Sequence, residues 1–405
     1  MSKKWLQQEG PQWVNEQIIT REQYERILSL YCAPQRSIGL LPILGCLLLG
    51  LGVLSFVAAN WQDLPELFRI GLMIAAMIGF YIGGQRLLDK GHASLGIGVI
   101  GIGLFTFGAS IILIGQMFHM IAYSALSIVI WSAAGTALAY LYRSRYLYTI
   151  SLILVTIAQF YSSTSFHSFN YAAFVLLLVG LGYYALRSRD TFTAVAWSAT
   201  AVIQSLMLVT SNDWKFLWYL VPLLLIYTAG DFAKSAAQRA ALQFPALGAA
   251  FIFAMAMSMF GSEEHLDIKE SILVQPLALI PVLGALLVLS WLFKQRAGSS
   301  RSFPQWMLFL PLVYLPVPAI SIVYLIIIFV FSLYVLVQGY AEENRRSVNI
   351  GTVLFLVSTM IAYFKLTWGF LDKSLFFITG GLLLLLLSWL LNRKRKHLFQ
   401  HNQEG

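Results

Sequence analysis

The stretch GGLLLLLLSWLL, residues 380–391, decides the fold class of this chain. It carries no charge, and its polar and apolar residues do not alternate as they do in the roughly 10-residue strands of a membrane β-barrel. A helix crosses a bilayer in about 20 apolar residues, and runs of this kind recur along nearly all of the 405 residues. The sequence therefore predicts an all-α fold, a polytopic transmembrane helical bundle.

The composition agrees with a membrane protein. Hydrophobic residues make up 59% of the chain, only 11% of the residues are charged, and the mean hydropathy is +0.74. A soluble protein of this length needs more charge on its surface. The two cysteines, Cys32 and Cys46, fall in a predicted cytosolic segment and in the first predicted span, so a disulfide framework is not indicated.

We expect about 14 membrane spans, each a predominantly apolar segment. They cover residues 38–59, 66–86, 94–115, 121–142, 146–161, 170–186, 191–210, 216–232, 240–260, 271–293, 303–316, 319–339, 347–364 and 374–392. The eleventh span, FPQWMLFLPLVYLP, is short and rich in proline, and every later span would invert if it failed to cross. The transmembrane bundle thus occupies residues 37–392, between a small cytosolic helical hairpin at 1–36 and a basic cytosolic tail at 393–405.

The distribution of basic residues supports this map. Of the 27 Lys and Arg residues, all but five fall in segments that the map assigns to the cytoplasm. The five exceptions are Arg69, Lys215, Lys269, Lys365 and Lys373. Such a bias over short loops is what the positive-inside rule predicts, so both termini are expected in the cytoplasm. The net charge of +9 is accounted for by these loops and the tail, and no nucleic-acid partner is expected.

The N-terminal head has the pattern of a helical hairpin. In ITREQYERILSLY, residues 19–31, Thr20 is a candidate N-cap and Gln23 follows three residues later, which is a capping box. One apolar stripe then recurs at helical spacing. Its members are Tyr24, Ile27, Leu28 and Tyr31. We expect this face to dock on the membrane surface or to bind a protein partner.

The chain lacks the residue sets that most catalytic sites need. None of the 18 acidic residues falls near the middle of a predicted span, and Asp231, for example, lies at the cytoplasmic end of one. This pattern counts against a proton- or sodium-coupled transporter built on a buried carboxylate and against paired catalytic acids. The six histidines form no zinc-binding pair. No cofactor or metal is expected, and an enzyme has the least support.

Several polar or helix-breaking residues lie within the predicted spans. Three amides and a hydroxyl either join helices by hydrogen bonds or line a polar path: Gln159, Gln204, Gln275 and Thr156. Three prolines either break helices, as in transporters, or are tolerated in ordinary spans: Pro222, Pro276 and Pro281. The stretch GIGVIGIG, residues 96–103, has no preceding strand and is interpreted as a helix-packing surface rather than a dinucleotide loop.

Three stretches carry a resemblance to a known family. They are the head with Trp13, Val14 and IITREQYERILSLY, the first span with its exit LGCLLLGLGVLSFVAANWQDLP, and GASIILIGQMFHM at residues 108–120. Over residues 12–145 the chain resembles the bacterial multi-span membrane proteins grouped as "domain of unknown function 2157". The C-terminal part, from AYFKLTWGFLD to NRKRK, is similar to the end of related families. The resemblance implies a bacterial inner membrane protein and brings no activity, substrate or cofactor.

The resemblance also implies a candidate site. Asn60 and Trp61 match the outer end of the family's first span, and Gln116 and His119 match the outer end of its third. The charge map independently assigns both groups to the outer side. No second histidine or acid accompanies His119, so we interpret these residues as an outward-facing, hydrogen-bonding site rather than a metal site.

Two functions remain open. In the first, the protein is a transporter or lipid-handling protein that uses the outward-facing polar site. In the second, it is a non-transporting scaffold or sensor that recruits a partner through the N-terminal hairpin. The tail is either a stop-transfer signal or a site for anionic lipids beside the bilayer. Its basic residues are Arg393, Lys394, Arg395 and Lys396.

Overall fold

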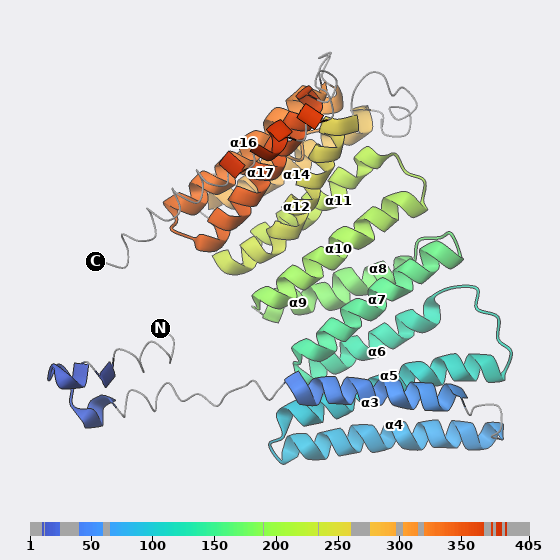
Figure 1. Ribbon diagram of the computed structural model, residues 1–405. Helices are drawn as coiled ribbons and strands as arrows, with labels where there is room; N and C mark the ends of the chain where they lie inside the picture. The colour runs from blue at the N-terminus through green and yellow to red at the C-terminus, as the bar shows by residue number, and fades with distance from the viewer. Residues whose placement is uncertain are drawn as a thin grey trace. The chain divides into compact units, whose positions relative to one another are not determined.

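The structure is a computed structural model in which the chain folds into helices joined by short turns (Figure 1). It describes residues 10–24 without 12, 40–59, 65–188, 190–233, 235–260, 276–296, 303–314, 320–367, and 374–386 without 376–377 and 383–384. No strand occurs among these residues, and the predicted all-α membrane bundle is confirmed. The chain divides into two compact units, residues 1–122 and 123–405.

Unit 1 contains three long helices that pack closely. They are α3 (Leu40–Ala59), α4 (Glu66–Asp89) and α5 (Ala93–Met117). A Cβ atom added to Gly96 would lie 2.8 Å from the carbonyl oxygen of Gly84, so the backbones of α4 and α5 touch there. Gly103 faces the ring of Tyr81, whose Cε1 would lie 3.0 Å from a Cβ added to this glycine. GIGVIGIG is therefore a packing surface, as the sequence predicts.

The head forms the expected capping box. The backbone N–H of Gln23 donates to Thr20 Oγ1 at 3.3 Å, and the N–H of Thr20 donates to Gln23 Oε1 at 3.0 Å. Each side chain thus satisfies a backbone donor that a helix start leaves open. Residues 13–15 and 21–24 are helical on either side of a turn.

Unit 2 contains the remaining helices. Its first part holds α6 (Leu126–Tyr142), α7 (Arg145–Ser165), α8 (Tyr171–Val175), the π-helix η3 (Leu176–Leu181), α9 (Gly182–Ser188), α10 (Thr191–Ser211), the 3-10 helix η4 (Phe216–Tyr219) and α11 (Leu220–Asp231). Its second part holds α12 (Ala236–Phe260), α14 (Pro276–Arg296), α15 (Phe303–Met307), the 3-10 helix η5 (Leu312–Tyr314), α16 (Ile320–Ala341) and α17 (Arg345–Thr367).

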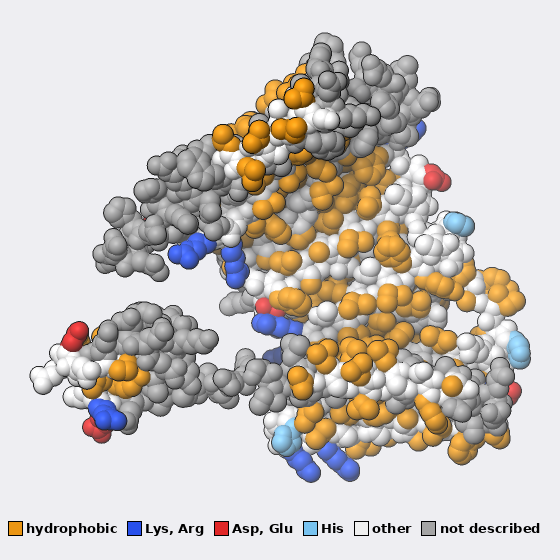
Figure 2. Space-filling view, in the orientation of Figure 1, with side chains coloured by type: hydrophobic (Ala, Val, Ile, Leu, Met, Phe, Trp, Pro, Cys, Tyr) orange, Lys and Arg blue, Asp and Glu red, His pale blue; other side chains and the backbone are white. Residues whose placement is uncertain are grey.

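The described residues contain nine helices that are long and apolar enough to cross a membrane. Two shorter apolar helices, Leu126–Tyr142 and Phe216–Asp231, coincide with expected spans. α3 coincides with the first expected span, and the last one, 374–392, is described only in part. Ile252, Val288 and Ile326 are among the exposed large apolar side chains. Apolar side chains cover the flank of the helices in Figure 2, as a lipid-facing surface requires.

The loops that carry most of the basic residues meet at one end of unit 2, which we call the basic end. Arg145, at the start of α7, pairs with Asp190 before α10 at 2.8 Å. Gln238, near the start of α12, donates to the carbonyl of Ala185 in α9 at 3.0 Å. At the opposite end, Lys365 of α17 donates to a carbonyl near the end of α12. The helices from α6 to α12 therefore alternate in direction, as do α16 and α17.

Between α14 and α16 the chain must return from the basic end to the opposite end. α14 ends at the basic end, because its Lys294 lies 3.9 Å from Asp231 at the end of α11. α16 also ends there, because its Gln338 shares a cavity with Gln243 near the start of α12. The described part of this return is Phe303–Tyr314, which we call the broken segment.

The broken segment is not the single span that we expected at 303–316. It consists of α15, with five residues, and η5, with three, joined by a turn. Pro311 lies between them, and proline has no N–H to continue a helix. The N–H groups of Leu310 and Leu312 instead donate to the carbonyls of Met307 and Leu310. By contrast, α14 begins at Pro276 and continues through Pro281, so those prolines do not break it.

The amides within the spans join helices. Gln204 of α10 is fully buried, and its Nε2 donates to the carbonyl of Val155 in α7 at 3.3 Å. The amide of Gln159, in the orientation that satisfies both of its groups, bonds to the backbone of Asn170 at 3.1 and 3.3 Å. Thr156 donates to a carbonyl of its own helix. Bundle-forming hydrogen bonds are therefore confirmed for both amides, and Gln275 lies outside the described residues.

Candidate functional site

The structure describes half of the outward-facing site that the sequence predicts. Gln116 is an exposed residue near the end of α5. His119 follows in the turn, with a φ of +49°, and its N–H donates to the carbonyl of Gln116 at 3.2 Å. Its side chain is exposed. Asn60 and Trp61 lie outside the described residues.

The predicted partner-binding face is described at one position. Tyr24 is half-buried, and its ring lies against Gly10, where an added Cβ would clash with Cε2. Tyr24 therefore packs inside the hairpin. Ile27, Leu28 and Tyr31 lie outside the described residues, as does the basic tail at 393–396.

A buried ion pair lies at the basic end of unit 2. Asp231 is the last residue of α11, and Lys294 lies in the last turn of α14. Their side chains are only 1% and 4% exposed, and Lys294 Nζ lies 3.9 Å from Asp231 Oδ1. The sequence places Asp231 and Lys294 at the ends of predicted spans, and the structure has both at helix ends. It shows in addition that neighbouring helices bury both side chains, which their position in the sequence does not indicate.

The carboxylate of Asp231 is held by two neutral donors as well as by Lys294. Ser290, one turn before Lys294, donates its hydroxyl to Oδ2 at 2.7 Å. Gln243 of α12 donates to Oδ1 at 2.8 Å and also reaches the carbonyl of Tyr227 at 3.1 Å. Gly230 permits this approach, because a Cβ there would lie 2.7 Å from Gln243 Cγ. Three helices thus supply the surroundings of one carboxylate.

The ammonium of Lys294 connects the ion pair to the broken segment. It donates to the hydroxyl of Tyr227 and lies 3.5 Å from Gln305 Oε1 of α15. Tyr227 in turn donates to Gln305 Oε1 at 2.5 Å. The ammonium also lies 4.4 Å from the ring centre of Tyr227 and 5.4 Å from that of Trp306, distances typical of cation–π contacts.

A cavity of about 360 Å³ adjoins this cluster, among α12, α15, α16 and α17. Gln243 and Gln305, which contact the ion pair, both line it. Toward the basic end its wall includes Gln338, Glu342 and Asn344. Much of the remaining wall is apolar, with Phe244, Leu247, Phe251, Phe331 and Leu354. The cavity is therefore amphipathic, with amides that connect it to a buried charge.

No direct sign of this site is present in the sequence. Asp231 and Lys294 lie far apart in the chain, and each stands beside loop residues. A partial signal was available in the proline-rich segment at 303–316, because broken helices in transporters often adjoin binding sites. Among the described residues, no group of three or more His, Cys, Asp or Glu side chains could hold a metal ion.

Comparison with known proteins bears on the N-terminal third of the chain. Residues 11–148 match a family model described as "Predicted membrane protein (DUF2157)". The resemblance inferred from residues 12–145 is therefore confirmed. No curated protein and no solved structure matches the chain. The ion pair and its cavity lie outside the matched residues.

Proposed function

We propose that this chain, whose residues 11–148 match the DUF2157 family of predicted membrane proteins, moves a lipid or another amphiphilic solute across the membrane. In this proposal the transfer involves the Asp231–Lys294 pair, the adjoining cavity and the broken segment. One observation carries the proposal: Gln305 of the broken segment bonds to both Tyr227 and Lys294. Any movement of this segment therefore changes the contacts of a buried charge.

Physical arguments favour a working role for the ion pair. Well-packed apolar residues often stabilise an interior as well as a buried ion pair does, so stability alone is a weak reason to keep one. Ionisable residues within membrane bundles commonly mark substrate or ion pathways. Discontinuous helices supply the binding sites of many transporters. Here Gln305 and Trp306 of the discontinuous segment both contact Lys294 of the buried pair.

The cavity wall indicates the class of substrate. Among the described residues, Gln305 keeps its Nε2 as a donor and Gln243 keeps its Oε1 as an acceptor for a polar group in the cavity. The apolar wall around Phe244 and Phe331 suits a hydrocarbon part. A molecule with both parts, such as a lipid, fits this division better than a simple ion does.

The proposal includes an orientation in the membrane. The positive-inside rule assigns the basic end of unit 2 to the cytoplasm, and with it both termini, in a bacterial inner membrane. The candidate group Asn60, Trp61, Gln116 and His119 would then face outward. We also propose that the tail residues Arg393, Lys394, Arg395 and Lys396 contact anionic lipids.

Liposomes containing the purified protein test the proposal. The probes are NBD-labelled phosphatidylglycerol and phosphatidylethanolamine, with transfer between leaflets followed by dithionite bleaching. We expect wild-type protein to transfer at least one probe faster than empty liposomes do. Gln305→Ala should slow transfer about tenfold, since loss of a buried hydrogen-bond partner costs about 1–3 kcal/mol.

Two further variants make the result specific. Gln85→Ala, on an exposed turn of α4, serves as the control and should transfer like the wild type. Gln116→Ala tests the outward-facing group. Slower transfer by this variant would indicate that the group lies on the path of the lipid. Wild-type rates equal to those of empty liposomes for both probes would contradict lipid transfer.

The alternative function is a scaffold or sensor, favoured by the reciprocal Thr20–Gln23 hydrogen bonds of the head. In that case, crosslinking pull-downs with the full chain should recover a partner that a chain lacking residues 1–34 loses. Gly10→Leu, which displaces Tyr24, should weaken the same contact. Identical partner sets for the full and shortened chains would exclude recruitment through the hairpin.

A further inference from the structure

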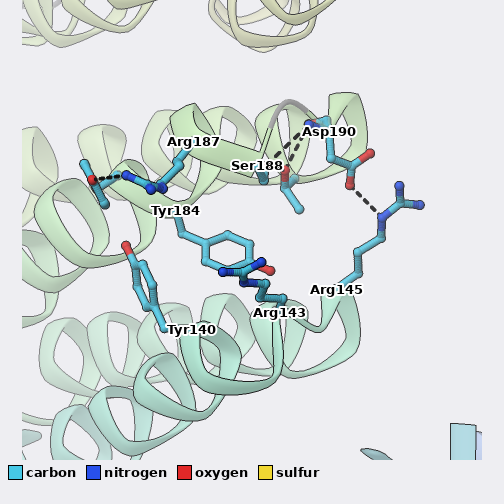
Figure 3. Close-up of a pocket in the computed structure, with 9 residues that line it drawn as sticks. Tyr140, Arg143, Arg145, Tyr184, Arg187, Ser188 and Asp190 are labelled. Carbon is cyan, nitrogen blue, oxygen red and sulfur yellow. Dashed lines mark hydrogen bonds and ion pairs between the residues drawn. The ribbon is translucent and has the colours of Figure 1, made fainter. Parts of the chain in front are cut away.

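A second pocket lies at the basic end of unit 2, away from the ion pair, and we call it the arginine pocket. It has a volume of about 650 Å³. Nine residues line it: Tyr140, Arg143, Arg145, Tyr183, Tyr184, Arg187, Ser188, Asp190 and Thr193. Figure 3 shows Arg143 and Arg145 rising from the turn between α6 and α7, with Arg187, Ser188 and Asp190 on the opposite side. The lining thus contains three guanidinium groups and a single carboxylate.

The carboxylate neutralises only one of the three arginines. Asp190 Oδ2 pairs with Nε of Arg145 at 2.8 Å. Arg187 donates to the hydroxyl of Tyr183 at 3.0 Å, which is a neutral partner. Arg143 has no hydrogen bond or ion pair with any residue that the structure describes. Two guanidinium charges therefore remain uncompensated by the described lining.

The floor of the pocket is a rigid group of tyrosines. The ring of Tyr184 stacks on Tyr148 at 4.7 Å between centres and meets Tyr140 edge-on at 5.2 Å. Tyr140 donates its hydroxyl to the carbonyl of Gly180 at 2.6 Å, and Tyr148 donates to that of Leu181 at 3.1 Å. The arginines therefore lie beside tyrosines that hydrogen bonds and ring contacts already hold in place.

The two carbonyls belong to the π-helix η3, Leu176–Leu181. A third carbonyl of η3, that of Leu177, accepts from Trp197 Nε1 of α10 at 2.9 Å. Single-turn π-helices within α-helices are rare and occur frequently at functional sites. Here the π-turn offers acceptors to three aromatic residues on three other helices, Tyr140, Tyr148 and Trp197, and so fixes the pocket floor.

We propose that the arginine pocket binds a phosphate-bearing anion. Guanidinium groups bind phosphate oxygens through paired, charge-assisted hydrogen bonds, and Arg143 and Arg187 are available for them. The volume exceeds that of a phosphate ion and leaves room beside the tyrosine rings for the organic part of the ligand. The phosphate belongs either to a lipid headgroup or to a soluble compound. This site is separate from the proposed transfer path.

Binding to purified protein in detergent tests the proposal without any transport. Native mass spectrometry would compare phosphatidylglycerol with phosphatidylcholine, and inorganic phosphate would be added as a competitor. The variant Arg143→Gln/Arg187→Gln removes two charges and leaves the Arg145–Asp190 pair intact. The control Arg86→Gln/Lys90→Gln removes two charges at the end of α4.

We expect wild-type protein and the control to retain phosphatidylglycerol in preference to phosphatidylcholine. The pocket variant should lose affinity about tenfold or more, since it lacks two charge-assisted contacts. Competition by millimolar inorganic phosphate would show that the phosphate group alone suffices for binding and would favour a soluble phosphate compound, whereas its absence would favour the lipid. Equal retention by the pocket variant and the control would overturn the proposal, and so would equal binding of the two lipids. Unchanged melting temperatures would verify that both variants are folded.

Discussion

Replacing Lys294 with methionine is expected to lower the free energy of unfolding by about 3–5 kcal/mol, the usual cost of leaving a buried charge without its partner. Asp231 would remain enclosed among α11, α12 and α14, with only the neutral donors Ser290 and Gln243. Methionine is apolar and of similar length, so the loss reflects the charge more than the packing.

The measurement is thermal unfolding in detergent at one heating rate, because membrane proteins often unfold irreversibly. Lys215→Met removes an exposed lysine and should change stability by no more than about 0.5 kcal/mol. The double variant Asp231→Asn/Lys294→Met should recover most of the loss, since asparagine keeps hydrogen-bonding groups for Ser290 and Gln243. A Lys294→Met protein as stable as the wild type would mean that Asp231 needs no buried partner.

The second large effect is expected at the contact between α16 and α17. A Cβ added to Gly351 would lie 2.6 Å from both the Cα and the N atom of Leu336, so the two backbones touch there. Gly339 makes a similar approach, since a Cβ added to it would lie 2.7 Å from the N atom of Val348. Gly351→Leu must push the helices apart and should cost about 1–3 kcal/mol or more.

Gly284 of α14 provides the matched control, because a Cβ there would meet nothing within 4 Å. Gly284→Ala should preserve or raise the melting temperature, since alanine favours helix by about 1 kcal/mol over glycine. Gly351→Leu should lower it clearly in the same assay. If the two variants melted alike, the backbones of α16 and α17 would not be in contact.

Most of the helices could be predicted from the sequence, because apolar length is itself the signal for a membrane helix. α4, α5, α10 and α16 lie close to the spans expected at 66–86, 94–115, 191–210 and 319–339. The capping box at Thr20 and Gln23 was also predictable, since both partners lie within one turn. The π-helix at Leu176–Leu181 was not, because its pattern of hydropathy does not differ from that of an α-helix.

The ion pair was also not predictable from the sequence, but the reason differs from that for the π-helix. Position along a span indicates only that Asp231 and Lys294 lie at span ends, whereas burial depends on which other helices cover those positions. Gln243 and Gln305, which complete the cluster, come from two further elements. The same limit applies to the arginine pocket, whose arginines counted in the sequence only as loop charges that set orientation.

The most direct test of the central claim compares stability with transfer in one protein, Asp231→Asn/Lys294→Met. This variant removes both buried charges together and leaves neutral side chains of similar size in their place. If the pair serves lipid transfer, the variant should melt near the wild-type temperature and transfer labelled lipid no faster than empty liposomes do. Wild-type transfer by a stable double variant would contradict the account and leave the ion pair with a structural role alone.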